Sequence, residues 1–233
     1  MIIGIFGYDF IHPKTTEILK NTVLNGFKVG AVFLAPKINY SNDGKILSID
    51  NSQVNNEARD FCTKNSIQVL RVKHDNEDLI SSIVLNKDIE LGLIGGARLI
   101  PGSIIGLFRK GIINYHPGKI PETSGLDSLY WSIKKNIPVF VTAHFIDEKV
   151  DAGFFIFESR VKILIKDSVQ AIRKRIMKKQ LELNHMVLKG IEEKTFDLKK
   201  IVRPQKNKRL TSQEIKQIMK RFERWKNFIS TEA

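Results

Sequence analysis

Residues 2–35 have the sequence IIGIFGYDFIHPKTTEILKNTVLNGFKVGAVFLA, in which two apolar runs enclose an amphipathic one. The apolar runs Ile2–Tyr8 and Lys28–Ala35 are rich in β-branched and aromatic residues and predict strands. Between them, Thr15–Asn25 places apolar residues at helical spacing and is followed by Gly26, a typical helix stop. A helix of this length between two strands needs a crossover connection, which makes the strands parallel.

The alternation of strands and helices continues to about residue 146. We expect a loop or hairpin between Pro36 and Ser52, strands at Ser66–Val72, Ile89–Ile94, Gly111–Tyr115 and Val139–Ile146, helices at Gln53–Lys64, Asn76–Asn86 and Leu126–Asn136, and a short helix after Pro101. This order predicts an α/β fold, a Rossmann-like and mostly parallel sheet flanked by helices. Such sheets bind ligands beyond the carboxyl ends of their strands, where the strand order switches.

The pattern changes after Asp151. An extended segment is predicted at Phe154–Leu164, a long helix from Asp167 to about Glu193, a basic linker at Lys199–Arg209 and a final helix from Thr211 to about Phe228. We therefore expect a catalytic domain at residues 1–195 and a short helical or extended appendage at residues 196–233. The final helix is expected to expose an apolar face suited to a homodimer, made of Ile215, Ile218, Met219, Phe222 and Trp225.

Composition narrows the class of protein. Hydrophobic residues make up 42% of the chain, which is typical of a globular protein. The single cysteine, Cys62, excludes an internal disulfide and predicts a packed side chain in a reducing cytoplasm. No stretch reaches the roughly 20 apolar residues of a membrane helix, and the N-terminus lacks the features of a signal peptide, so no membrane partner is expected.

The net charge of +13 is concentrated in the second half of the chain. Between Ser159 and Lys226 there are 21 Lys or Arg against 7 Asp or Glu, a surplus of 14. No basic motif interleaved with aromatic residues accompanies this surplus. A solvated, lysine-rich surface is the favoured interpretation, and a nucleic-acid partner is not expected.

The residues that carry chemistry follow the predicted strand Gly111–Tyr115. Side chains at positions i and i+2 of a strand share a face, so Asn114 and His116 point together into the crevice beyond the strand end. Asp151 lies in a loop after another strand and can approach the same crevice. An amide and an imidazole suit the oxyanion of acyl transfer, and a carboxylate–imidazole pair helps to move a proton from an amine. On spacing alone, a structural role for His116 remains the preferred interpretation.

A wider set of motifs resembles the formyltransferase family between about Leu91 and Ile156. The family signature combines an Asn-x-His-Pro strand end, a Leu-Pro loop leading to a glycine, a Thr-x-His strand and an Asp-x-Gly loop. This sequence has the matching groups in the same order: Asn114-x-His116-Pro117, Ile120-Pro121 to Gly125, Thr142-x-His144 and Asp151-x-Gly153. The resemblance implies an N-formyltransferase with 10-formyl-tetrahydrofolate as donor, no metal, and Asn114, His116 and Asp151 as catalytic residues.

The resemblance also implies where the reduced folate binds. The segment after the fourth core strand is expected to pass over the pterin with Gly96, Arg98, Leu99 and Ile100. The loop after Phe145 is expected to form the other wall with Asp147 and Val150. His144 is interpreted as structural, and His12, His74 and His185 are expected at the surface.

The amine acceptor is predicted from departures from the family. Gly7-Tyr8-Asp9-Phe10-Ile11 lacks the glycine-rich phosphate loop of glycinamide ribonucleotide formyltransferase. This favours an amino sugar linked to a nucleoside diphosphate, with dTDP preferred, as in the synthesis of lipopolysaccharide O-antigen sugars. Such an acceptor is expected to contact Tyr8, Lys73 or Arg71, Pro121, Gly125 and the loop Glu122–Asp127, and the resemblance adds a homodimer.

Two other classes remain open at this point. Phosphoribosylglycinamide or methionyl-tRNA formyltransferase activity keeps the chemistry and changes the acceptor; the second is weakened because the separate C-terminal barrel domain of that enzyme has no counterpart here. A noncatalytic, nucleic-acid-binding protein is the least favoured, because such a protein has no need of Asn114, His116 and Asp151 together.

Overall fold

The computed structural model describes residues 1–40, 46–50, 52–147, 153–202 and 207–231. Two compact units divide the chain, Met1–Asn114 and Tyr115–Ala233. The strand that contains the boundary belongs to both units.

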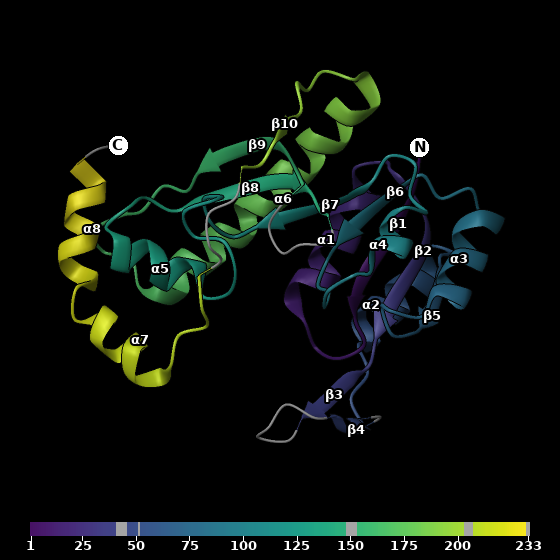
Figure 1. The fold of residues 1–233 in the computed structure, drawn as a ribbon, viewed down its shortest axis with the longest axis horizontal. Helices are drawn as coiled ribbons and strands as arrows, with labels where there is room; N and C mark the ends of the chain where they lie inside the picture. Colours follow the sequence, from purple (N-terminus) through teal and green to yellow (C-terminus); the bar gives the residue numbers. More distant parts are fainter. Residues whose placement is uncertain (41–45, 51, 148–152, 203–206, 232–233) are drawn as a thin grey trace. The chain divides into compact units, whose positions relative to one another are not determined.

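The first unit is a parallel sheet with its crossover helices (Figure 1). It contains β1 (Ile2–Tyr8), α1 (Pro13–Leu24), β2 (Lys28–Ala35), β3 (Lys37–Tyr40), β4 (Ile46–Asp50), α2 (Asn56–Lys64), β5 (Gln68–Arg71), α3 (Glu77–Asn86), β6 (Leu91–Ile94), α4 (Gly102–Ile105) and the start of β7 (Ile112–His116). β1 pairs in parallel with β2 and β6, β2 with β5, and β6 with β7. α1 contacts α2, and α3 contacts α4.

The predicted parallel sheet is confirmed in this unit. β1 and β2 have the predicted bounds, and the region between Pro36 and Ser52 contains the antiparallel hairpin β3–β4. β7 begins and ends one residue later than predicted, which places His116 inside the strand. Cys62 is fully buried, as expected for a packed side chain, and burial raises the pKa of its thiol to about 11.

The first turn of α1 lies directly against the ends of two strands. Tyr8 N–H donates to Thr15 Oγ1 at 3.1 Å, and Thr15 Oγ1 lies 3.3 Å from the carbonyl oxygen of Gly95. A Cβ atom on Gly7 would overlap the side chain of Thr15, and one on Gly95 would lie 3.1 Å from Thr15 Cα. Glycine at both positions therefore permits this close contact between helix and sheet.

The second unit is built on antiparallel strands. It contains α5 (Ser128–Lys135), β8 (Phe140–Phe145), β9 (Phe154–Arg160), α6 (Val169–Glu193), β10 (Lys199–Lys200), α7 (Ser212–Met219) and α8 (Phe222–Thr231). β9 pairs antiparallel with β8 and with β10. α6 contacts β8 and β9, and α5 contacts α7. The strand order is β10-β9-β8-β7-β6-β1-β2-β5, a mostly parallel sheet as predicted, to which this unit adds the antiparallel strands.

The prediction of one final helix is wrong. The α-helical hydrogen bonding is interrupted at Lys220 and Arg221, whose N–H groups donate to the carbonyls of Gln217 and Ile218, three residues back. These tighter bonds separate α7 from α8. The predicted start is confirmed, because Thr211 and Glu214 form a capping box.

The expected exposed apolar face of the final helix is also wrong. Ile218, Phe222 and Trp225 are buried within the second unit, with exposed fractions of 6%, 7% and 1%. Trp225 Nε1–H donates to the carbonyl of Ile137, and Lys226 Nζ donates to that of Asp167. The apolar stripe stabilises the unit itself, so the homodimer is left as a prediction from the resemblance alone.

Two histidines differ from the expected surface position, while His185 is exposed. His74 is only 3% exposed, and its Nε2–H donates to the carbonyl of Phe33 at 3.1 Å. Burial lowers the pKa of His74 to about 4. His12 is half-buried and caps α1, and burial together with the charge of Lys14 lowers its pKa.

We predict that His74 makes the protein acid-sensitive. Its pKa is lower when folded than the ordinary value, so its neutral ring favours folding above pH 6.5, and this contribution is lost as the pH falls towards 4. Between pH 7 and pH 5 the free energy of unfolding should fall by about 2 kcal/mol from this residue. Urea unfolding at the two pH values should show a smaller fall in His74→Gln, whereas His185→Gln, at an exposed site, should behave like the wild type. An equal fall in all three proteins would contradict this assignment.

Candidate active site

The end of β7 presents the two polar side chains predicted from the sequence. Asn114 and His116 are two residues apart on this strand and therefore share a face. Asn114 is half-buried and His116 is 3% exposed, while Ile113 and Tyr115 are buried on the opposite face. Pro117 follows the strand, so the chain turns away directly after the imidazole.

The ring of His116 is held by the loop that follows it. Its Nε2 lies 2.9 Å from the carbonyl oxygen of Thr123, an acceptor only, so Nε2 carries a proton. In the neutral ring, Nδ1 then holds the lone pair and is the atom that can accept a proton from an amine. His116 can donate through Nδ1 only as an imidazolium.

The loop from Pro117 to Asp127 is anchored by three hydroxyl groups. Thr142 Oγ1 donates to the carbonyl of Gly118 at 2.7 Å and accepts from the N–H of Ile120 at 3.4 Å. Ser128 Oγ donates to the carbonyl of Pro117 at 2.6 Å, and Thr123 Oγ1 to that of Lys119 at 3.0 Å. Thr142, the threonine of the Thr-x-His motif, thus supports the loop that holds His116.

The same loop is braced by the segment predicted to be a linker. Asn207 Nδ2 donates to the carbonyls of Glu122 and Ser124, both at 3.0 Å, and Lys135 Nζ donates to Asn207 Oδ1 at 2.8 Å. The predicted acceptor residue Gly125 forms a β-bridge with Asn207. No local sequence signal identified Asn207, because its partners lie more than 70 positions away.

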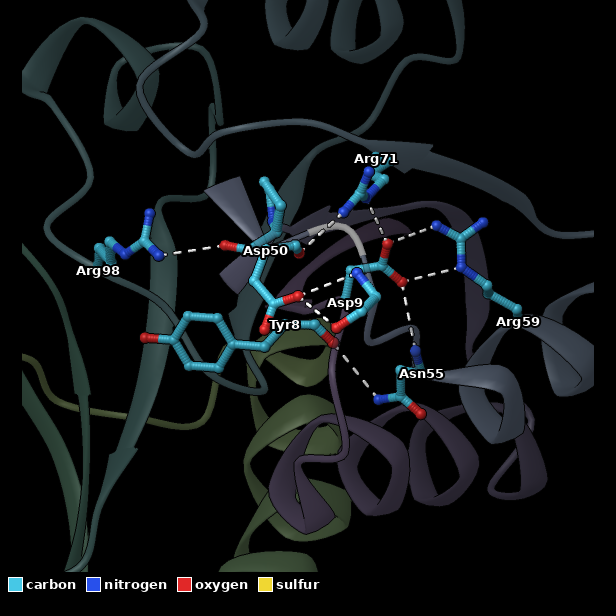
Figure 2. Close-up of polar contacts among 9 residues, drawn as sticks. Tyr8, Asp9, Asp50, Asn55, Arg59, Arg71 and Arg98 are labelled. Carbon is cyan, nitrogen blue, oxygen red and sulfur yellow. Dashed lines mark hydrogen bonds and ion pairs between the residues drawn. The ribbon is translucent and has the colours of Figure 1, made fainter. Parts of the chain in front are cut away.

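The connection between β1 and α1 is organised around a buried carboxylate (Figure 2). Asp9 is fully buried, and Arg59 donates to both of its oxygens, from Nε at 2.8 Å and from Nη2 at 2.6 Å. Arg71 adds an ion pair from Nε at 2.8 Å, and its Nη2 donates to the carbonyl of Asp50. Two arginines against one carboxylate leave this group with a positive charge, in which Asp9 fixes how both guanidinium groups lie.

Aromatic rings adjoin this charged group. Tyr8 stacks on Phe10 with 4.8 Å between ring centroids, and the rings of Tyr8 and His12 are nearly perpendicular with centroids 5.0 Å apart. Gly96 lies against the same rings, because a Cβ atom there would come within 2.9 Å of Tyr8 Cδ2. The predicted acceptor residue Tyr8 and the predicted folate residue Gly96 are therefore neighbours in the first unit.

The other predicted residues are placed as follows. Arg98 is half-buried and donates to the carbonyl of Pro36 at 3.1 Å. Leu99 is 68% exposed and Ile100 is buried, so Leu99 is the one of the two that offers apolar surface to a flat ring. Lys73 and Pro121 are half-buried, and Asp147 is exposed. Asp151 and Val150 lie outside the described residues.

The expected folate-binding role of this segment stays a prediction. Leu99 is exposed, whereas Gly96 is buried and its N–H already donates to the carbonyl of Phe6 at 3.1 Å. Across residues 1–40, 46–50, 52–147, 153–202 and 207–231, no group of three His, Cys, Asp or Glu side chains is placed to hold a metal ion. His144 is fully buried, as expected of a structural residue.

Several known proteins are similar to parts of this chain. The family model described as formyl transferase matches residues 40–188. Phosphoribosylglycinamide formyltransferase of Haemophilus influenzae is 24% identical over 140 residues, which cover 60% of this chain and 65% of the relative. GDP-perosamine N-formyltransferase of Brucella melitensis is 29% identical over 93 residues, 39% of this chain and 36% of the relative. The matches thus span less than two thirds of these curated relatives.

The fold is also similar to that of a solved structure over most of the chain. A sugar N-formyltransferase from Shewanella has a TM-score of 0.63 at 15% identity, and the alignment covers 95% of this chain and 87% of that one. The family model covers well over half of the chain, and the Asn-x-His-Pro strand end lies within the matched region. On this ground the chain belongs to the formyl transferase family.

Proposed function

We propose that this protein transfers the formyl group of 10-formyl-tetrahydrofolate to the amino group of a sugar linked to a nucleoside diphosphate. The observation that carries the proposal is the end of β7, where Asn114 and His116 share a face and the His116 ring is held through Nε2. Support comes from membership of the family and from relatives named as N-formyltransferases. The synthesis of surface polysaccharides is the expected setting.

The proposed reaction forms a bond between the acceptor nitrogen and the formyl carbon and breaks the bond from that carbon to the folate nitrogen. Negative charge develops on the formyl oxygen, where the amide N–H of Asn114 can donate. The acceptor nitrogen loses a proton, which Nδ1 of a neutral His116 can accept and then pass to the departing folate nitrogen. Asp151 is proposed, from the resemblance, to orient the imidazole and to stabilise its protonated form.

The acceptor is inferred from the connection between β1 and α1. A phosphate bound at this turn would meet the buried carboxylate of Asp9, although the two arginines offset its charge. Tyr8 and Phe10 offer a stacked aromatic surface suited to a base or a sugar ring. Lys73 follows β5 and is proposed to contact the diphosphate. The GDP-perosamine enzyme among the relatives supports an amino-sugar nucleotide. The choice of dTDP as the nucleotide stays part of the proposal and rests on the resemblance alone.

Glycinamide ribonucleotide is the second candidate acceptor, because the Haemophilus influenzae relative is named for it. An acceptor panel separates the two. We expect turnover of 10-formyl-tetrahydrofolate with amino sugars linked to dTDP or another nucleoside diphosphate, followed by the absorbance of the folate product. Turnover with glycinamide ribonucleotide or charged tRNA, but with none of the sugars, would reverse the choice of acceptor.

We predict that Asn114→Ala, His116→Ala and Asp151→Ala each lower kcat more than they raise KM for the folate. Each group is proposed to act mainly in the transition state, and the loss of one such donor typically lowers kcat by about 10²- to 10³-fold. Steady-state kinetics together with circular dichroism would check that the variants fold. A variant that keeps near-normal kcat would remove that residue from the mechanism.

We predict that Asn207 controls acceptor binding through the loop Glu122–Asp127. Asn207→Asp keeps the size of the side chain but replaces the amide that donates to two carbonyls, each bond contributing about 1 kcal/mol. KM for the acceptor should rise by roughly 3- to 10-fold, while KM for the folate changes less. Asn86→Asp, the same exchange on the exposed surface of α3, is the control. Equal changes in both KM values would assign Asn207 to general stability instead.

A further inference from the structure

The first turn of α1 brings a cation to the proposed catalytic amide. Lys14 lies at the second position of α1, and its Nζ donates to Asn114 Oδ1 at 3.3 Å, across 100 positions of sequence. Both residues belong to the first unit, and both are half-buried. No motif in the sequence connects them, and the proposed reaction assigns no role to Lys14.

The chemistry of the pair determines how the amide is oriented. An ammonium group has three donors and no acceptor, so the amide atom that faces Lys14 is the oxygen. The amide is planar, and its NH₂ group therefore points away from Lys14. The adjacent positive charge also polarises the amide and strengthens its N–H groups as donors. Both effects favour donation to a developing oxyanion.

The position of Lys14 in the helix is not explained by helix stability. The N-terminal end of a helix carries a partial positive charge, and a cation there is unfavourable by about 0.3–1 kcal/mol. The first turn of α1 contains no acidic residue to offset it. His12 caps the helix through Nδ1, and Pro13 occupies the first helical position, so the turn is well formed without any contribution from Lys14.

The turn that carries Lys14 is held firmly in place. Thr15 accepts a hydrogen bond from Tyr8 N–H and lies within 3.3 Å of the Gly95 carbonyl. The next residue, Thr16, lies 3.4 Å from Asn55 Oδ1 through its hydroxyl. The backbone of this turn is held by these contacts, so the Lys14 side chain starts from a fixed position. A positioning role requires this.

We propose that Lys14 is a positioning residue that orients and polarises the Asn114 amide for formyl transfer. This inference rests on the proposed function and deepens it, because it names a group outside the family motif that acts through Asn114. Lys14 does not itself contact the reacting atoms in this proposal. Loss of the Lys14 amine should therefore lower kcat only when residue 114 is asparagine.

The test is a double-mutant cycle between Lys14→Met and Asn114→Ala. Lys14→Met should lower kcat by about 10- to 100-fold, somewhat less than the loss of the donor itself, with KM for the folate changed by less than about 3-fold. In the Asn114→Ala background, Lys14→Met should change kcat by less than about 2-fold. Lys14→Arg keeps a donor and should restore part of the rate.

Stability measurements separate positioning from folding. Lys14→Met should melt at or above the wild-type temperature, because it removes a cation from a helix N-terminus. Lys20→Met is the matched control on the same helix, at a half-buried lysine that pairs with Glu57, and should keep wild-type kcat.

The outcomes are distinct. Suppose that the wild type is active. If Lys14→Met then has the same kcat, or lowers kcat equally with Asn114 and with Asn114→Ala, only the role of Lys14 is overturned. A wild type without formyl transfer to any amine would overturn the proposed function and this inference together.

Discussion

The close approach of α1 to the ends of β1 and β6 is the contact on which the first half of the proposed site depends. In a parallel sheet, ligands bind beyond the carboxyl ends of the strands, and the helix that follows β1 begins at that edge. Glycine at positions 7 and 95 lets the helix come near enough for Thr15 to bond Tyr8 and approach the Gly95 carbonyl. Because this turn is fixed, Lys14 can meet Asn114 on β7.

The second unit supports the other half of the strand end in a different way. His116 is held by the carbonyl of a loop, and that loop has little regular structure of its own. Its backbone carbonyls are bonded by Thr142, Ser128 and Asn207, which come from separate parts of the chain. Trp131 Nε1–H donates to the carbonyl of Lys208, and Leu210 N–H donates to Asp127, so the segment that carries Asn207 is itself held. The basic C-terminal region therefore contributes to the geometry around the imidazole.

The β1–α1 connection differs from a glycine-rich phosphate loop because it contains the buried carboxylate of Asp9. A buried charge is tolerated only when it is paired, and here two arginines pair it from α2 and β5. Removing one arginine would leave the charge poorly compensated, so the three residues act as a unit. The result is a turn in which two guanidinium groups are fixed beside a stacked aromatic pair.

The sequence by itself determined the order of strands and helices, the parallel arrangement of β1, β2, β5 and β6, and the pairing of Asn114 with His116 on one face. These follow from local patterns, since periodicity, turn glycines and the two-residue repeat of a strand act over a few residues. Tertiary structure alone decided that His74 is buried, that the final helix divides and packs inward, and that Lys14 and Asn207 reach their partners. Those outcomes depend on contacts between residues far apart in the chain, which local patterns do not encode.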